Sequence, residues 1–179
     1  MARIPLSCSA FDKLLAIENA RPSIHTVSRL RCVFRLSPTI RILHPSFRDF
    51  LSDRGRCRKD IWFLDLTLNN RLLAVQCMDR LRKVLKRNIC GSVLSPEPVA
   101  ETLPEDVSYA CTFWIDHVCW VTNETPSIAV HVENILRGYL LNWLEAMSCL
   151  RISRDTVGLL NRLLQWLMVS PLFFPARQC

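Results

Sequence analysis

Glycine is scarce in this sequence, with four residues at positions 55, 91, 138 and 158 out of 179. None of them belongs to a G-x-x-x-x-G-K-[ST] pattern, the loop whose backbone amides hold nucleotide phosphates. We therefore expect no P-loop ATPase core in this chain. Because glycine is unfavourable inside helices, its scarcity favours a mainly α fold.

Motifs for catalysis and metal binding are missing as well. Serine, histidine and aspartate occur, but in no recognisable nucleophile motif, so we expect no enzyme. Cys111, His117 and Cys119 come nearest to a metal-ligand set. Positions six residues apart on a helix point in different directions, and no C-x-x-C pair completes four ligands. We therefore expect neither a metal nor a resident cofactor.

Long uninterrupted apolar runs are also absent. The most apolar segment, residues 157–174, contains Asn161, Arg162, Gln165 and Pro171, which makes it a poor membrane span. The nine cysteines are an odd number, several fall on apolar faces of expected helices, and no signal peptide precedes them. These features predict a cytoplasmic protein in a reducing compartment, without membrane contact.

The composition that is present is that of a folded domain, with 50% hydrophobic and 22% charged residues. The net charge of +7 is uneven: residues 1–40 carry +4, residues 41–87 carry +7 and residues 88–179 carry −4. Such asymmetry indicates either a basic surface for nucleic acid or an acidic partner, or two halves of the protein that face each other.

The most informative stretch is residues 39–51, where a short strand passes directly into a helix. Residues 39–43 alternate as a strand does, and Pro45 suits the first turn of a helix. His44 lies at the joint, and its charge changes most easily near neutral pH. We expect the helix to bury three apolar side chains: Phe47, Phe50 and Leu51.

The elements before and after this joint predict a winged helix. One helix is capped by Ser7 and ends near Asn19, and a second runs from Pro22 to beyond Phe34 with three arginines outward. Residues 61–64 are expected to form a second strand that pairs back as the wing. The outward arginines are Arg29, Arg31 and Arg35.

Helical periodicity dominates the remainder. Helices are predicted over 69–86, after a capping box at 102–105, around 132–147, and after Ser153 as far as Leu167. The fold class is therefore mainly α: a winged-helix-like part with a short β-hairpin (1–66), then a helical bundle or linker (67–168). Residues 169–179 are predicted to be an irregular and possibly mis-spliced tail, because two prolines follow with no new element.

Two further groups of residues have structural interpretations. The basic run from Arg80 to Arg87 could contact phosphates or act as a nuclear import signal, but interleaved leucines at helical spacing favour the wet face of a buried helix. Four tryptophans are expected to pack in the core or between helices: Trp114, Trp120, Trp143 and Trp166.

Several strings of the sequence, in order, resemble the large fungal NACHT-type signalling proteins of the STAND class of NTPases. The resemblance spans residues 5–167, nearly the whole chain. It rests on Pro5 to Ser7, Ile40 to Leu51, Leu85 to Gly91, Leu103 to Cys111, Trp114 to His117, and Leu141 to Ala146.

The resemblance implies a position after the nucleotide-binding core, as winged helix and helical linker of a larger parent. In related proteins a histidine at the strand-to-helix joint contacts the diphosphate of ADP, so His44 is the implied nucleotide-sensing residue, and ADP or ATP would bind only in a full-length parent. Pro45 replaces an aspartate that follows this histidine in plant relatives. Interdomain contacts with the core are expected at Arg41, Arg48 and Arg82.

The expected function is thus that of a non-catalytic regulatory module that acts through protein or interdomain contacts, as a fragment of such a parent. A free-standing winged-helix DNA binder is one alternative, suggested by the net charge of +11 over residues 1–87. Against it, Val33 and Phe34 lie among the arginines, and the acidic second half would repel phosphates. A non-functional truncated gene product is the other alternative.

Overall fold

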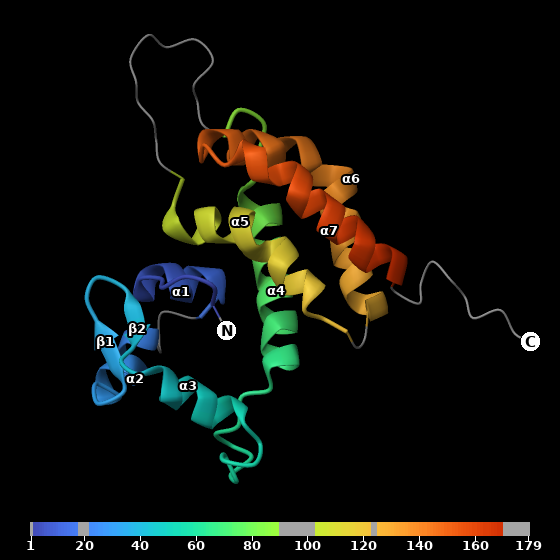
Figure 1. Cartoon of the computed structure of the whole chain (residues 1–179). Coiled ribbons are helices and arrows are strands. Elements are labelled where there is room, and N and C mark those ends of the chain that lie inside the picture. The colour runs from blue at the N-terminus through green and yellow to red at the C-terminus, as the bar shows by residue number, and fades with distance from the viewer. Residues whose placement is uncertain (1, 18–21, 90–102, 123–124, 170–179) are drawn as a thin grey trace, which may run out of the picture.

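A computed structural model of the chain describes residues 2–17, 22–89, 103–122 and 125–169. As predicted, the fold is mainly helical, with a two-stranded antiparallel hairpin near the N-terminus followed by helices (Figure 1). The elements in order are α1 (Cys8–Leu14), α2 (Ser23–Arg29), β1 (Phe34–Leu36), β2 (Ile40–Ile42), α3 (Pro45–Ser52), α4 (Leu66–Val84), α5 (Glu105–Cys119), α6 (Thr125–Cys149), the 3₁₀ turn η1 (Ser153–Asp155) and α7 (Thr156–Val169).

The hairpin forms between β1 and β2, with Arg35 opposite Arg41 in the register. Strand β2 agrees with the prediction, but its expected partner at residues 61–64 was wrong. Ile61 and Trp62 lie in a turn, no strand forms over 61–64, and the amide of Leu64 bonds to the carbonyl of Leu51 instead. A three-residue connection closes a hairpin locally at a smaller entropic cost than a partner twenty residues away.

The second helix is shorter than predicted, because α2 ends at Arg29. Val33 and Phe34 favour extended backbone, and they lead the chain into β1. Arg31 therefore lies in a turn and Arg35 on a strand, so the predicted row of outward arginines on one helix does not exist.

Helix α3 begins at Pro45 as predicted, but it buries none of its residues. Phe47, Phe50 and Leu51 are half-buried rather than buried. The ring of Phe47 packs edge-on against that of Phe34, with centroids 5.9 Å apart. The burial prediction was wrong because α3 packs mainly on the small hairpin, which has too little surface to cover an apolar helix face.

The later helices agree with the prediction apart from their ends. Helix α4 begins at Leu66 because Asp65 accepts the amides of Thr67 and Leu68 as its N-cap. Helix α5 begins at Glu105 with Pro104 as N-cap, and Thr102 of the predicted capping box lies outside the described residues. Helix α7 includes Val169, the first residue of the predicted tail, and the rest of that tail lies outside the described residues.

The hydrophobic core is centred on α4 and α5, which cross and pack against each other and are covered by α1, α6 and α7 (Figure 1). Trp114 and Trp143 are fully buried and pack edge to face at 5.9 Å. Trp120 differs from the prediction: it is exposed, under the guanidinium of Arg3. Because Leu6 and Leu14 belong to the same core as α4 and α5, packing is continuous across the predicted boundary at residue 66.

Candidate interaction surface around the hairpin

His44 is the N-cap of α3 and is exposed. Its Nδ1 accepts the amide of Ser46 at 3.2 Å and lies 2.7 Å from the hydroxyl oxygen of the same residue. Because Nδ1 acts as the acceptor, the ring proton of neutral His44 is on Nε2. The histidine thus has a local structural role, and Nε2–H is the group with which it could donate to an external oxygen.

The three predicted arginines lie in different places. Arg41 is exposed on β2, where its Nε donates to the Thr39 hydroxyl at 3.3 Å. Arg48 on α3 pairs with Asp49 at 3.3 Å, and both side chains are about half exposed. Arg82 lies near the far end of α4 and pairs with Asp79 at 3.5 Å. The structure therefore groups Arg41 and Arg48 near His44 but not Arg82.

A hollow of about 610 Å³ separates the N-terminal segment and hairpin from the first turns of α4. Arg3, Arg41 and Arg48 line it together with apolar side chains such as Phe34 and Leu72. The charged side chains that line the hollow within the described residues are all basic. A binding site here would favour an anionic group attached to an apolar one.

A buried hydrogen-bond network links the N-terminal segment to α5 and α4, and the sequence did not predict it. The backbone N–H of Arg3 donates to the hydroxyl oxygen of Tyr109, which lies 2.8 Å from Nε2 of His117. Nδ1 of His117 is 2.8 Å from Oδ1 of Asn70, whose Nδ2 donates to the carbonyl of Leu66. Since Oδ1 must accept, His117 donates from Nδ1 and accepts the Tyr109 hydroxyl proton.

The network fixes the charge states of its members. Burial, with a smaller contribution from the charge of Arg3, lowers the pKa of His117 to about 3, so the ring is neutral at physiological pH. Burial likewise raises the pKa of Tyr109 above its usual range. The spacing of Asn70, Tyr109 and His117 at helical intervals on apolar stripes was the available signal, since buried polar side chains need partners.

Arg80, which was predicted to face outward, instead pairs with Asp106 of α5. Its Nε lies 2.5 Å from Oδ2, and the two side chains are 24% and 2% exposed. The prediction failed because the solvent face of α4 ends where α5 packs over it. Leu81 and Leu85 are buried, while Arg82 and Lys83 are exposed on α4, and Lys86 and Arg87 are exposed just beyond its end at Val84.

The thiols of the core are structural. Cys77 and Cys111 are fully buried, and burial raises the pKa of the Cys111 thiol to about 12. Six described cysteines are free, and Cys149 is disulfide-bonded. Among the residues that the structure describes, no group of three or more His, Cys, Asp or Glu side chains could hold a metal ion.

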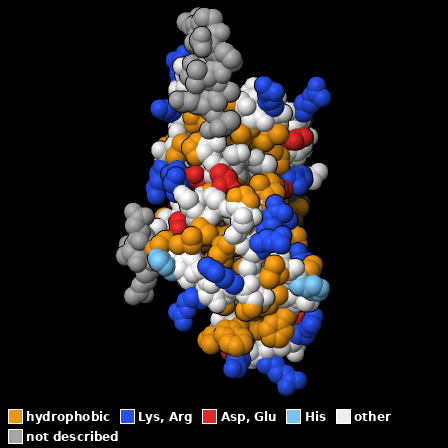
Figure 2. All heavy atoms as spheres, turned by 90° about the vertical axis from the view of Figure 1, so that its left-hand side faces the viewer, with side chains coloured by type: hydrophobic (Ala, Val, Ile, Leu, Met, Phe, Trp, Pro, Cys, Tyr) orange, Lys and Arg blue, Asp and Glu red, His pale blue; other side chains and the backbone are white. Residues whose placement is uncertain are grey.

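The outer surface of the hairpin region, residues 22–64, combines apolar and basic side chains. Ile61 is 85% exposed and Trp62 53%, while Ile24, Leu30 and Leu43 are 41–51% exposed. In Figure 2 hydrophobic side chains gather toward the lower end of this side of the molecule, with Lys and Arg around them. Five arginines and no acidic residue occur between Pro22 and Arg48.

Comparisons of the chain with models of protein families, with curated proteins and with solved structures find no match. No helix in the described ranges is long and apolar enough to cross a membrane.

Proposed function

We propose that this chain is a non-catalytic regulatory module that acts through contacts with another domain or protein, as part of a NACHT-type signalling protein. The observation that carries the proposal is the exposed apolar and arginine-rich surface of the hairpin region. Clustered exposed apolar side chains are a feature of interaction surfaces. The identity of the parent is inferred from the strings within residues 5–167 that resemble, in order, those of fungal NACHT-type proteins.

In such a parent, His44 would face the nucleotide of the preceding core. Its Nε2–H could donate to a diphosphate oxygen while Nδ1 caps α3, so nucleotide contact and helix geometry would be coupled through one ring. Arg41 and Arg48 lie on the same side of the molecule and would contact acidic groups of the core. Arg82 would contribute separately, from the far end of α4.

The first test is the genomic sequence upstream of the chain. An open frame that encodes a P-loop is expected, and its product can be expressed separately and titrated against this chain by calorimetry. We expect association in the micromolar range. Arg41→Glu and Arg48→Glu should each weaken it about tenfold, as reversal of a charge at a desolvated contact does. An upstream sequence without a P-loop frame would reject the proposed parent.

A matched control is Arg137→Glu, which makes the same charge change on α6, where Arg137 is 80% exposed and pairs with Glu133. Equal weakening by Arg137→Glu and Arg41→Glu would mean that only net charge matters. The chain alone should show no measurable ADP affinity, because it encodes no phosphate-binding loop. Micromolar ADP binding by the isolated chain would contradict this assignment.

A further inference from the structure

The outer edge of β1 is an open strand edge. The bonds from Ser37 N–H to the carbonyl of Thr39 and from Leu43 N–H to the carbonyl of Val33 place the hydrogen-bonded pairs of the hairpin at odd-numbered residues. Antiparallel pairing alternates, so the backbone groups of Phe34 and Leu36 point away from β2. The Phe34 N–H bonds to the carbonyl of Leu30. No described residue bonds the Phe34 carbonyl or the N–H and carbonyl of Leu36.

The other edge of the hairpin makes one backbone bond to the N-terminal segment. The N–H of Ile40, which points outward from β2, donates to the carbonyl of Leu6 at 2.8 Å. The N-terminal segment therefore lies along β2, in the position that a third strand would take. Each edge thus makes one such bond, from Ile40 N–H on β2 and from Phe34 N–H on β1, and the β1 edge keeps three backbone groups without a partner among the described residues.

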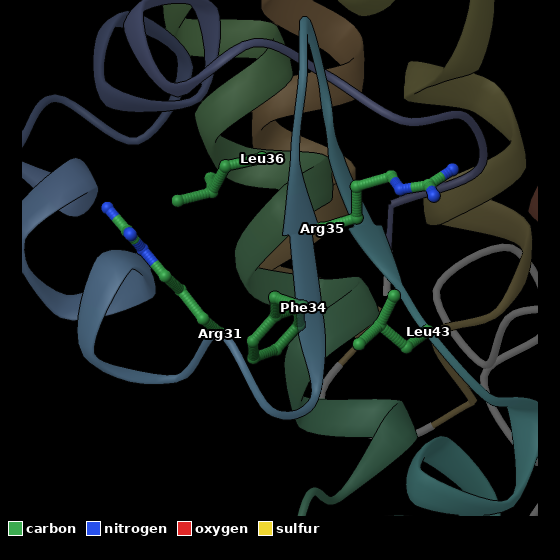
Figure 3. Close-up of a pocket in the computed structure, with 5 residues that line it drawn as sticks. All are labelled: Arg31, Phe34, Arg35, Leu36 and Leu43. Carbon is green, nitrogen blue, oxygen red and sulfur yellow. The ribbon is translucent and has the colours of Figure 1, made fainter.

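A hollow of about 470 Å³ lies beside β1, lined by Arg31, Phe34, Arg35, Leu36 and Leu43 (Figure 3). Phe34 and Leu36 point to one side of the strand and Arg35 to the other. The hollow is thus bordered by both faces of the strand, as a space beside an edge must be. On the strands the side of Phe34 and Leu36 is apolar, and the side of Arg35 combines the guanidinium groups of Arg35 and Arg41 with the apolar side chain of Leu43.

The basic face carries an unfavourable charge pair. Arg35 lies directly opposite Arg41 in the register, both side chains are exposed, and neither has an ion pair with a described residue. Like charges that are directly opposite on a sheet are destabilising. A carboxylate beside Arg35 would relieve this repulsion, and the guanidinium could bind it through two parallel hydrogen bonds.

We propose that the outer edge of β1 binds an extended acidic peptide segment by β-strand addition. The partner strand would exchange up to three backbone hydrogen bonds with Phe34 and Leu36. It would place acidic side chains beside Arg35 and apolar ones beside Phe34 and Leu36, because side chains alternate between the faces of a sheet. The partner is therefore a strand in which acidic and apolar residues alternate.

A peptide fits this edge better than a nucleic acid does. Three unpaired backbone groups of alternating donor and acceptor character match a peptide backbone, whereas a phosphate backbone offers acceptors only. Three of the five lining residues are apolar, and the lining contains no aromatic pair on which bases could stack. The inference rests on the proposed role as an interaction module, to which it adds one surface and the chemistry of one partner.

The test uses the full chain and a fluorescein-labelled heptapeptide of alternating glutamate and valine, followed by fluorescence anisotropy. We expect weak but saturable binding that is lost when lysine replaces glutamate. A third peptide, N-methylated on alternate amides that would face β1, should bind at least tenfold more weakly. Hydrogen exchange at the Leu36 amide should slow when the glutamate peptide is bound.

Arg35→Glu should weaken binding at least fivefold. This variant also replaces a repulsive cross-strand pair by an attractive one with Arg41, so it should fold at least as well as the wild type. Arg137→Glu is the matched control and should change the affinity less than twofold. The two variants have the same net charge, which separates a local contact from general electrostatics.

Three results would overturn the inference. One is the lack of saturable binding at 1 mM peptide, and another is equal affinity for the N-methylated peptide, which would show adhesion by charge alone. The third is tighter, Arg35-dependent binding of an oligothymidine probe, which would assign the edge to nucleic acid. If the peptide does not bind but the chain associates with an upstream core, only this inference is rejected. If the peptide binds but no such association occurs, only the proposed function is rejected.

Discussion

The helical core consists of α1 and α4 to α7, and the hairpin region consists of residues 22–64. Both contain large apolar side chains, but the core buries them, whereas the hairpin region leaves them half-buried or exposed. In the core, Trp114 and Trp143 are completely buried, along with most of the inward face of α5. In the hairpin region only Ser23 and Cys57 are buried among the described residues. The hairpin region is thus held by local contacts, whereas the core is held by contacts between distant segments.

This difference predicts where the molecule opens. Regions with few buried apolar contacts exchange backbone hydrogens through low-energy local opening, whereas core helices open only on global unfolding. A region that leaves apolar side chains in water also gains most from a partner. The hairpin region is therefore the part of the molecule whose order should depend on what binds it, which accords with the proposed role in interdomain contacts.

The largest expected difference in stability between the two regions comes from truncating one tryptophan in each. Trp143→Ala should lower the free energy of unfolding by about 3–5 kcal/mol, because it empties a fully buried site and also removes the indole bond to the Cys111 carbonyl at 2.9 Å. Trp62→Ala removes a side chain that is 53% exposed and should cost less than about 0.5 kcal/mol. Urea unfolding followed by circular dichroism measures both. Comparable losses would show that the hairpin region contributes as much as the core.

The sequence predicted the core well because long helices repeat the same signal over many turns. Apolar residues at helical spacing identified α4, α5 and α6, whose interiors match the prediction. The joint at His44 was also predictable, since Pro45 is favourable at a first helical turn and unfavourable within a strand. These signals are local, and packing in the structure reinforces them.

The hairpin was harder to predict because its pairing depends on contacts between short segments. A strand of three residues, such as β1, carries little periodicity, and Phe34 at the end of a helical pattern resembled a helix residue. The side chains that bind Asp106 and His117 could not be predicted for a similar reason. Each of them, Arg80 or Asn70, lies on a different helix, and the sequence alone does not pair helices residue by residue.

The second effect compares two ion pairs of similar geometry, one in each region. Asp106→Asn should cost about 2–3 kcal/mol, because it leaves the Arg80 charge partly buried without its partner. The cost falls below that of a fully buried pair since Arg80 reaches water. Asp60→Asn breaks a 2.5 Å pair with Arg54 whose side chains are 62% and 80% exposed, and it should change stability by less than about 0.5 kcal/mol. Equal costs in denaturant titrations would contradict the assignment of Asp106 to the core.

The smallest expected effect is the pH dependence of stability that arises from His117, a member of the hydrogen-bond network between the N-terminal segment and the core. The pKa of His117 is about 3 in the folded protein and about 6.5 when the chain is unfolded, so below pH 6.5 the unfolded state binds a proton that the folded state does not. Stability should therefore be complete above pH 6.5 and fall as the pH is lowered, by about 1–2 kcal/mol between pH 6.5 and 5, where carboxylates contribute little. His117→Gln lacks the titrating group, and its stability should be nearly flat over this interval whatever its absolute value. Denaturant unfolding of both proteins at four pH values measures the difference in slope, and parallel slopes would mean that His117 is not the neutral, buried member of the core described above.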